Sequence, residues 1–298
     1  MTRSQAALKT WVRALIEDLV ATSDKNTLGF PHIEKSWEKP LVGFSAGNDL
    51  LYQFFKKDIG GFYWLPEEAF RQGFSDITAT ADQLTVVSWV IPQTGKTKKD
   101  QRKESLYPSE RWARSRLFGE EFNQLMRKQI SQSLTVAGYP AVAPMLLPAF
   151  QREISEKYGH ASSWSERHAA YVAGLGTFGL SDGLITPLGK AIRCGTVIAK
   201  MNVEPDPRPF EHHNQYCLFY FDGSCKKCSK RCPADAINES GHNKTLCHDY
   251  IRQTTTPHTD KAFNLTITSC GLCQSKVPCE SGIPPKIKNR LNPMAGVS

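Results

Sequence analysis

Apolar side chains near the start of the chain repeat at the spacing of an α-helix. They recur at i, i+3 and i+4 intervals, and they are Leu8, Trp11, Val12, Leu15, Ile16, Leu19 and Val20. A stripe of this kind marks the buried face of an amphipathic helix. The pattern therefore predicts that the chain opens with a helix packed on a core.

The clearest strand signal comes later, in a run of apolar and β-branched residues. Residues 84–91 (LTVVSWVI) predict a buried strand that Pro92 ends, because proline cannot donate a ladder hydrogen bond. The lysine-rich stretch 93–111 is predicted to be a polar loop. A long apolar stripe over residues 109–137 then predicts a second helix.

Helices and strands are mixed between residues 139 and 201. Residues 139–150 are apolar but rich in proline, which predicts a short strand followed by a loop. A helix is predicted to begin near Ser163, because Ser163 and Glu166 fit a capping box, and to end at Gly174. Residues 184–201 predict two further short strands. Without regular strand–helix alternation, the fold class is α+β.

A change in composition predicts a domain boundary near residue 203. Residues 203–215 (VEPDPRPFEHHNQ) contain three prolines and few apolar side chains, as a linker or an extended crossing segment does. Everything after this stretch is short, cysteine-rich and turn-rich. We therefore expect one α+β domain over residues 1–203 and a second domain over residues 204–298.

The sequence predicts neither a membrane span nor a secretory signal. No apolar run approaches the roughly 18 residues that a membrane helix needs. Arg13, Glu17 and Asp18 interrupt the apolar stretch at the N-terminus, and no twin arginine precedes it. We therefore expect a cytoplasmic protein.

Cysteine is distributed very unevenly along the chain. Eight of the nine cysteines lie between Cys217 and Cys279, and only Cys194 lies outside that segment. Without a secretory signal, such a cluster favours a metal site or a redox centre over a disulfide framework. Cys194, within a predicted strand, is expected to be a buried apolar side chain.

The cysteine spacing matches a bacterial ferredoxin module. The run Cys225-x2-Cys228-x3-Cys232-Pro233 has the ferredoxin pattern, in which the cysteine before proline reaches across to the other [4Fe-4S] cluster. This crossover predicts two ligand sets. One set contains Cys217, Cys225, Cys228 and Cys279, and the other contains Cys232, Cys247, Cys270 and Cys273.

Two points of the ligand assignment stay open. The usual spacing would place the remaining first-set ligand at position 222, where the chain has Asp222, so Cys217 is the available thiolate. The alternative metal site is a four-thiolate zinc ribbon made by the pairs Cys225/Cys228 and Cys270/Cys273. That alternative leaves four clustered cysteines without a role and gives none to the proline after Cys232.

The formal net charge of +8 is concentrated on the cysteine-rich part. From residue 217 onward there are 11 Lys and Arg against 6 Asp and Glu. Bound clusters with their thiolates are negatively charged, so much of this excess is expected to compensate them. The remainder would favour docking of an acidic electron donor, and the basic balance gives little support to nucleic-acid binding.

The glycine string Gly174-Leu-Gly176-Thr-Phe-Gly179 matches a dinucleotide fingerprint but follows a predicted helix, so it carries no weight as one. Together with other motifs, however, it resembles the family of epoxyqueuosine reductases and reductive dehalogenases. The matching segments are Glu166-Arg167, Ala173-Gly-Leu-Gly176-x2-Gly179, Leu184-Ile-Thr-Pro187 and the double-cluster tail.

The resemblance implies a particular architecture and cofactor set. It implies a nitroreductase-like domain that binds base-off cobalamin, followed by a ferredoxin-like domain with two [4Fe-4S] clusters. No cobalt-ligating D-x-H-x-x-G pattern is present, which is compatible with base-off binding. The positions implied for corrinoid binding are Gly174, Gly176, Gly179, Thr186 and Pro187.

The family also implies candidate catalytic residues. Epoxyqueuosine reductases carry an acidic aspartate shortly before the Glu-Arg pair, and His160 occupies that position here. Because imidazole titrates near neutrality, His160 is the first candidate proton donor, with Tyr158 and Glu166 behind it. The alternative role of Glu166 is helix capping.

The sequence therefore predicts a reductase in which electrons from a ferredoxin or flavodoxin pass through two clusters to cobalamin. The substrate would be a small molecule or a modified nucleoside whose bond is cleaved reductively. The alternative is an electron-transfer protein that serves a partner enzyme and has no chemistry of its own. A third reading is a tRNA-modifying reductase, but the chain lacks the C-terminal helical repeats that help those enzymes hold tRNA.

Overall fold

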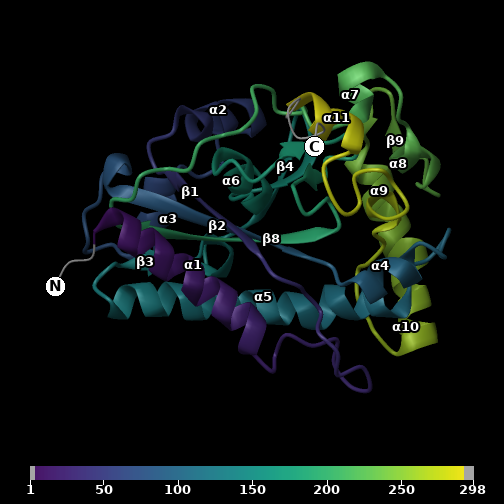
Figure 1. Ribbon diagram of the computed structural model, residues 1–298, viewed down its shortest axis with the longest axis horizontal. Helices are drawn as coiled ribbons and strands as arrows, with labels where there is room; N and C mark the ends of the chain where they lie inside the picture. Colours follow the sequence, from purple (N-terminus) through teal and green to yellow (C-terminus); the bar gives the residue numbers. More distant parts are fainter. Residues whose placement is uncertain (1–3, 292–298) are drawn as a thin grey trace, which may run out of the picture.

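The computed structural model describes residues 4–291 and is built around one antiparallel sheet (Figure 1). Four strands lie in the order β1-β2-β8-β3, and each neighbouring pair is antiparallel. They are β1 (Leu41–Ala46), β2 (Leu84–Pro92), β8 (Ile192–Lys200) and β3 (Ala141–Val142). The expected mixture of helix and sheet is confirmed.

Helices cover both faces of the sheet, which explains why every residue of β2 is buried (Figure 1). Val86 and Val90 belong to one core with α2, α3 and α6, whereas Val87, Trp89 and Ile91 belong to a second core with α1 and α5. The helices are α1 (Gln5–Thr22), α2 (Leu50–Ile59), α3 (Pro66–Gly73), α5 (Glu110–Val136) and α6 (Glu166–Val172).

The strand predicted over 84–91 and the helices predicted over 8–20 and 109–137 are confirmed. The polar loop predicted over 93–111 is wrong in part, because it contains α4 (Gly95–Gln101). Thr94 caps this helix by accepting a hydrogen bond from the Thr97 amide, and Thr97 and Gln101 are buried. The lysine run hid a helix whose inner face is polar.

The start of α6 corrects the predicted capping box. Ser165 is the N-cap and accepts a hydrogen bond from the amide of His168, whereas Ser163 hydrogen-bonds to the backbone of Gln151. Glu166 points to Arg127 instead of capping the helix.

Short hairpins surround the sheet. The prediction of two short strands over 184–201 is confirmed for β7, while β8 is a nine-residue central strand. The hairpins are β4 (Arg152–Ser155) with β5 (Gly159–Ser162), β6 (Thr177–Phe178) with β7 (Leu184–Ile185), and β9 (Ile237–Asn238) with β10 (Gly241–His242). The 3₁₀ turns are Ala81–Gln83, Pro144–Leu146 and Leu272–Gln274.

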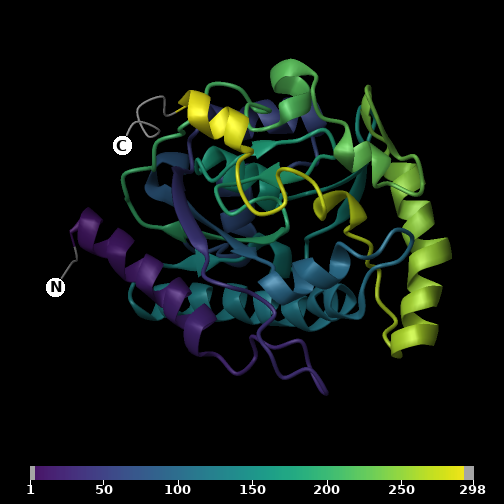
Figure 2. The same ribbon diagram turned by 45° about the vertical axis from the view of Figure 1, so that its right-hand side comes forward.

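The cysteine-rich part lies at one end of the sheet (Figure 2). Its helices are α7 (Leu218–Asp222), α8 (Lys227–Lys230), α9 (Lys244–Tyr250), a π-helical turn (Ile251–Thr255), α10 (Thr256–Phe263) and α11 (Pro285–Leu291). Tyr216, Ile237, Val277 and Ile287 belong to the same core as α2, α3 and α6. The cysteine-rich part is therefore packed into the sheet domain, and the boundary at residue 203 stays a prediction.

The segment 203–215 crosses the first part of the chain without regular secondary structure. Asp206 fastens it, because its carboxylate pairs with Lys9 at 2.6 Å and Arg13 at 2.8 Å and accepts the Phe44 amide. Within the described residues, no helix is long and apolar enough to cross a membrane.

Candidate functional site

The first set of cysteines gathers around one pocket. Cys217, Cys225, Cys228 and Cys279 line it together with Lys190. Electrostatic interactions link both Cys228 and Cys279 to Cys217 and Cys225. The chain thus brings together residues from three separate segments, in the grouping that the ferredoxin crossover predicts.

The second set gathers beside the first. Cys270 interacts electrostatically with Cys232, Cys247 and Cys273, and Cys247 interacts with Cys232 and Cys273. Cys273 also interacts with Cys228 of the first set. The two groups of four therefore adjoin each other, as an electron path between two clusters would require.

The turn before β8 holds the first set against the sheet domain. The Lys190 amide donates to the carbonyl of Cys279 at 2.9 Å, and the Ala191 amide donates to that of Glu280 at 3.2 Å. Gly189 has a φ of +87°, and a Cβ there would lie 2.2 Å from the Glu280 carbonyl oxygen. Only glycine permits this close approach.

The second set is held by α4 and α5. Gln101 on α4 is buried and donates to the Cys270 carbonyl at 2.9 Å. Gly271 has a φ of +72°, and a Cβ there would lie 2.0 Å from Nε1 of Trp112 on α5. Arg231 donates to the carbonyls of Glu104 and Leu272, which joins the loop after α4 to the same cysteine loop.

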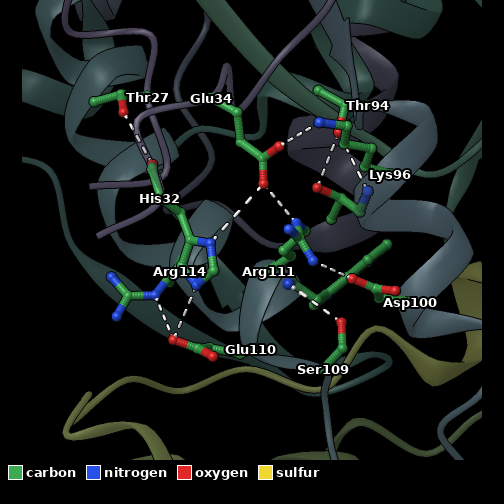
Figure 3. A network of polar contacts seen from close by, with 12 residues as sticks. Thr27, His32, Glu34, Thr94, Lys96, Asp100, Ser109, Glu110, Arg111 and Arg114 are labelled. Atoms are coloured by element: carbon green, nitrogen blue, oxygen red, sulfur yellow. Dashed lines mark hydrogen bonds and ion pairs between the residues drawn. The ribbon is translucent and has the colours of Figure 1, made fainter. Parts of the chain in front are cut away.

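An ion-pair network holds α4 in place (Figure 3). Glu34 accepts hydrogen bonds from Arg111 at 2.6 Å and from Lys96 at 3.0 Å, and Arg111 also pairs with Asp100 at 2.5 Å. The network ties the loop at residue 34 to both α4 and α5. It therefore fixes the helix whose last residue, Gln101, contacts the second cysteine set.

A buried lysine lies between the two cysteine sets. Lys190 is 3% exposed, and its Nζ donates to the Ser181 hydroxyl at 2.7 Å. Burial favours the neutral amine, but Cys279, Cys273 and the other nearby thiolates outweigh it and raise the pKa of Lys190. Nothing in the local sequence marks Lys190 as part of the site.

Asp222 does not line the pocket of the first cysteine set. The Asp222 carboxylate pairs with Lys286 at 2.5 Å and accepts the Ser224 amide at 3.0 Å. Cys217 is buried and lines the pocket with the other three cysteines. The geometry thus favours Cys217 over Asp222 as the fourth ligand, although iron binding itself stays a prediction.

The donor set fits two four-iron clusters. Burial raises the pKa of Cys247 and of Cys270 to about 12, and neighbouring thiols add to the shift. Bound iron would favour the thiolate over the thiol, because a coordinating thiol is deprotonated outright. Each set supplies the four cysteines that such a cluster takes, one for each iron.

The zinc alternative does not match the arrangement of the cysteines. The pairs Cys225/Cys228 and Cys270/Cys273 belong to different sets, each completed by other cysteines. Within residues 4–291, no group of three or more His, Cys, Asp or Glu side chains is arranged to hold a single metal ion. The two cysteine sets are therefore defined by their shared pocket and their electrostatic interactions, and not by a preformed ligand geometry.

The residues implied for corrinoid binding pack against the chain itself. A Cβ at Gly174 would lie 2.5 Å from the Pro207 carbonyl oxygen, and one at Gly176 would lie 2.3 Å from that of Ile185. These glycines are needed for close backbone packing and do not form an open cradle.

The other three implied corrinoid positions lie in or near the same turn region. Gly179 lines the pocket of the first cysteine set. Thr186 is buried, and its hydroxyl donates to the Gly189 carbonyl at 2.8 Å. The Pro187 carbonyl oxygen faces Gly282, where an added Cβ would lie 3.7 Å from it. Their contacts support the turn that docks the cysteine-rich part.

His160 and Tyr158 lie together beside the second cysteine set. The exposed His160 ring stacks on His248 with 4.5 Å between centroids, and His248 directly follows Cys247. Lys244 donates to the His160 carbonyl at 3.2 Å, and its Nζ lies 5.7 Å from the Tyr158 ring centroid. No sequence pattern marks His248 or Lys244 as part of the site, because their contacts join segments far apart in the chain.

The third candidate, Glu166, lies in a different environment. It is nearly buried, with its side chain 10% exposed, and it accepts two hydrogen bonds from Arg127, both at 2.7 Å, and one from the Thr196 amide at 3.1 Å. Its carboxylate is thus fully engaged with the protein. Cys194 is buried as expected, and burial raises the pKa of its thiol to about 12.

No protein-family model and no curated protein matches the chain. Its similarity is to solved structures of epoxyqueuosine reductases and reductive dehalogenases, the two kinds of enzyme that the sequence motifs resemble. The epoxyqueuosine reductase from Bacillus subtilis is 16% identical, with 95% of this chain and 68% of that chain covered and a TM-score of 0.48.

Two further structures show the same level of similarity. An epoxyqueuosine reductase with a tRNA-Tyr stem loop is 16% identical, with 95% and 69% of the two chains covered and a TM-score of 0.45. A reductive dehalogenase described in terms of B12-dependent dehalogenation is 16% identical, with 84% and 31% covered and a TM-score of 0.49. Because these likenesses are weak, the function proposed below rests on this chain's own residues.

Proposed function

We propose that this protein is an iron–sulfur oxidoreductase whose C-terminal part is a ferredoxin-like module with two [4Fe-4S] clusters. One observation carries the proposal: eight cysteines form two adjoining groups of four with a buried lysine between them. Cys217, Cys225, Cys228 and Cys279 would hold one cluster, and Cys232, Cys247, Cys270 and Cys273 would hold the other.

When bound, four-iron clusters supply one-electron transfer at potentials set by charge, hydrogen bonding and solvent exposure. In this chain, Lys190 would set the charge, because it places a positive charge beside both cysteine sets. Leu180 and Ile185 line the first pocket and would limit solvent exposure there. Both features fit a redox role.

The proposed destination of the electrons is a reductive site on residues 1–203, for which we infer a nitroreductase-like domain. The exposed His160 ring stacks on His248, the residue after Cys247, and this contact supports a proton donor on the side of α9 and the second cysteine set. His160 is the proposed donor, and the Tyr158 hydroxyl, which itself donates to Asp58 at 2.7 Å, is the weaker candidate. The reaction would be a reductive cleavage of a small molecule or modified nucleoside.

Glu166 is not retained as a proton donor. Its carboxylate accepts from Arg127 and from the Thr196 amide, which leaves it fixed inside the sheet domain. Its proposed role is to hold α6 against α5.

Cobalamin is the electron acceptor that the family resemblance implies, and it stays in the proposal as a group to be tested. Gly174 and Gly176 do not form an open cradle for it. No step is therefore derived through a corrinoid, and a ferredoxin or flavodoxin is the proposed source of electrons.

That closed glycine packing favours a second candidate, an electron-transfer protein that serves a separate enzyme. Anaerobic reconstitution with iron, sulfide and cobalamin, followed by gel filtration, distinguishes the two. A reductase of the proposed kind is expected to keep cobalamin at about one per chain. Protein that keeps its iron but no corrinoid would contradict the corrinoid-dependent function and favour the carrier.

Replacing Lys190 with methionine is expected to lower the midpoint potential of at least one cluster. Removing a buried positive charge beside the thiolates makes the added electron less stable. The measurement is a redox titration followed by electron paramagnetic resonance. Lys99→Met, which removes the same charge from an exposed position on α4, is the control and should leave both potentials unchanged; an unchanged potential in the Lys190 variant would contradict the assigned role.

A further inference from the structure

The segment that carries cysteines of both sets is strongly basic. Residues 225–232 contain four basic residues and no acidic one. The basic residues are Lys226, Lys227, Lys230 and Arg231, and the three lysines are exposed. Because Cys225, Cys228 and Cys232 lie in the same segment, each of these lysines is one or two residues from a proposed iron ligand.

Two of the three lysines have no acidic partner. Lys226 pairs with Glu239 in the turn between β9 and β10. Lys227 and Lys230, by contrast, form no ion pair and no side-chain hydrogen bond with any residue in the range 4–291. They lie three positions apart on α8, so both lie on one side of it. The exposed surface of α8 thus carries two positive charges that the protein does not compensate.

A third lysine without an acidic partner lies on the next loop. α8 packs against the 3₁₀ turn Leu272–Gln274, and Arg231 donates to the Leu272 and Ser275 carbonyls, both at 3.3 Å. Lys276 comes directly after Ser275, is exposed, and has no side-chain partner among the described residues. We refer to Lys227, Lys230 and Lys276 together as the lysine cluster.

The two cysteine sets have different surroundings. The His160 ring on β5 stacks on His248 beside the second set, which is the side of the proposed reductive site. α8, with its lysines, belongs to the segment of the first set and lies with β9 at the end of the molecule opposite β3 (Figure 1). The proposed reductive site therefore takes the second set, and the first set remains for an incoming electron donor.

We infer that the lysine cluster is the docking surface for the electron donor, and that this donor is an acidic redox protein of the flavodoxin or ferredoxin class. The inference rests on the proposed function, because it needs clusters that accept an electron. Acidic groups on a partner complement the unpaired lysines and steer its approach, which raises association rates by about 10- to 1,000-fold. Electron-transfer complexes bury less than about 1,200 Å² in total, so a small charged surface is enough.

Docking at the lysine cluster brings the donor to the stretch of chain between Cys225 and Cys232. One electron then passes from the donor, which is oxidised, to the first cluster, which is reduced. No bond is made or broken in this step, and no further reactant is needed.

The test measures, by calorimetry, how an acidic flavodoxin binds to the anaerobically purified full-length protein with its clusters. Two salt concentrations are used, about 0.05 M and about 0.5 M, because salt screens exposed charges. The double variant Lys227→Glu/Lys230→Glu is compared with Lys57→Glu/Lys128→Glu. This control makes the same charge change at exposed positions of α2 and α5 that likewise have no acidic partner among the described residues.

The wild type and the control are expected to bind flavodoxin equally well at low salt and at least about tenfold more weakly at high salt. The α8 variant is expected to bind at least about tenfold more weakly than the wild type at low salt, because repulsion replaces attraction.

Stopped-flow reduction of the clusters gives a second readout. The donors are reduced flavodoxin and reduced methyl viologen, a small cation that needs no docking surface. The ratio of the flavodoxin rate to the methyl viologen rate is expected to fall at least about tenfold in the α8 variant and to stay within about twofold of the wild type in the control. The ratio is used because a changed cluster potential would affect both rates.

The outcomes separate the docking surface from the proposed function. Wild-type protein that holds about eight irons but does not bind flavodoxin would overturn the docking surface and leave the clusters standing. Equal binding by the α8 variant and the wild type, or an equal loss in the control, would overturn it as well. Wild-type protein without iron–sulfur clusters would contradict the proposed function, and the docking surface would fall with it.

Discussion

Replacing Cys217 with alanine is expected to remove one of the two clusters and to lower iron from about eight to about four atoms per chain. Cys217 lines the same pocket as Cys225, Cys228 and Cys279, so its loss leaves that set with three thiolates. The measurement is iron and acid-labile sulfide content after anaerobic reconstitution, together with the electron paramagnetic resonance spectrum of the reduced protein.

Asp222→Ala is the matched control, since Asp222 occupies the position that the usual ferredoxin spacing would give to a ligand. Its carboxylate pairs with Lys286 and does not line the pocket of the first set, so both clusters should persist. If Cys217→Ala keeps both four-iron signals while Asp222→Ala loses one, the assignment of the first set is wrong.

Breaking the Arg127–Glu166 pair is expected to have the largest effect on stability. Arg127→Met should lower the free energy of unfolding by about 3–5 kcal/mol, because it leaves the nearly buried Glu166 charge without its counter-ion. Glu166→Gln should cost less than Arg127→Met, because Arg127 keeps its pair with Glu120 at 2.9 Å. Arg127 is 2% exposed and Glu166 10% exposed at the side chain. Burial raises the pKa of Glu166, so the Arg127 charge beside it is needed to keep it ionised.

Chemical denaturation of the two single variants and of the double variant measures this effect. The double variant should lose less free energy of unfolding than the two single variants lose together, since the two residues share one interaction. Glu17→Gln, which removes an exposed partner of Lys39, is the control and should change stability by less than about 1 kcal/mol. A Glu166→Gln variant with full stability but lost turnover would instead restore Glu166 as a catalytic residue.

The sequence predicted those parts of the fold that depend on simple periodicity. The strand at 84–91 and the helix at 109–137 were visible because apolar residues repeat along them. α4 was missed because its buried side chains, Thr97 and Gln101, are polar and leave no apolar stripe. The start of α6 was misplaced because Ser163 and Ser165 both fit a cap by type, and only tertiary contacts decide between them.

For the site, too, the residues in a local sequence pattern could be predicted, and those that depend on tertiary contacts could not. Cysteine spacing predicts two sets of four thiols, since the ferredoxin crossover is a local sequence pattern, and the ligand sets themselves stay a prediction. Lys190 carries no such pattern, and its role depends on a turn that the sequence does not reveal. The glycines from Gly174 onward suggested a ligand cradle, whereas their close approach is to backbone at Pro207 and Ile185.

The most direct test of the two-cluster assignment is the metal content and spectrum of the wild-type protein purified without oxygen. The protein is expected to contain about eight irons and eight sulfides per chain. The reduced protein should show two magnetically coupled four-iron signals, because Cys228 and Cys273 bring the two sets together. A single tightly bound zinc, or about four irons with one uncoupled signal, would contradict it.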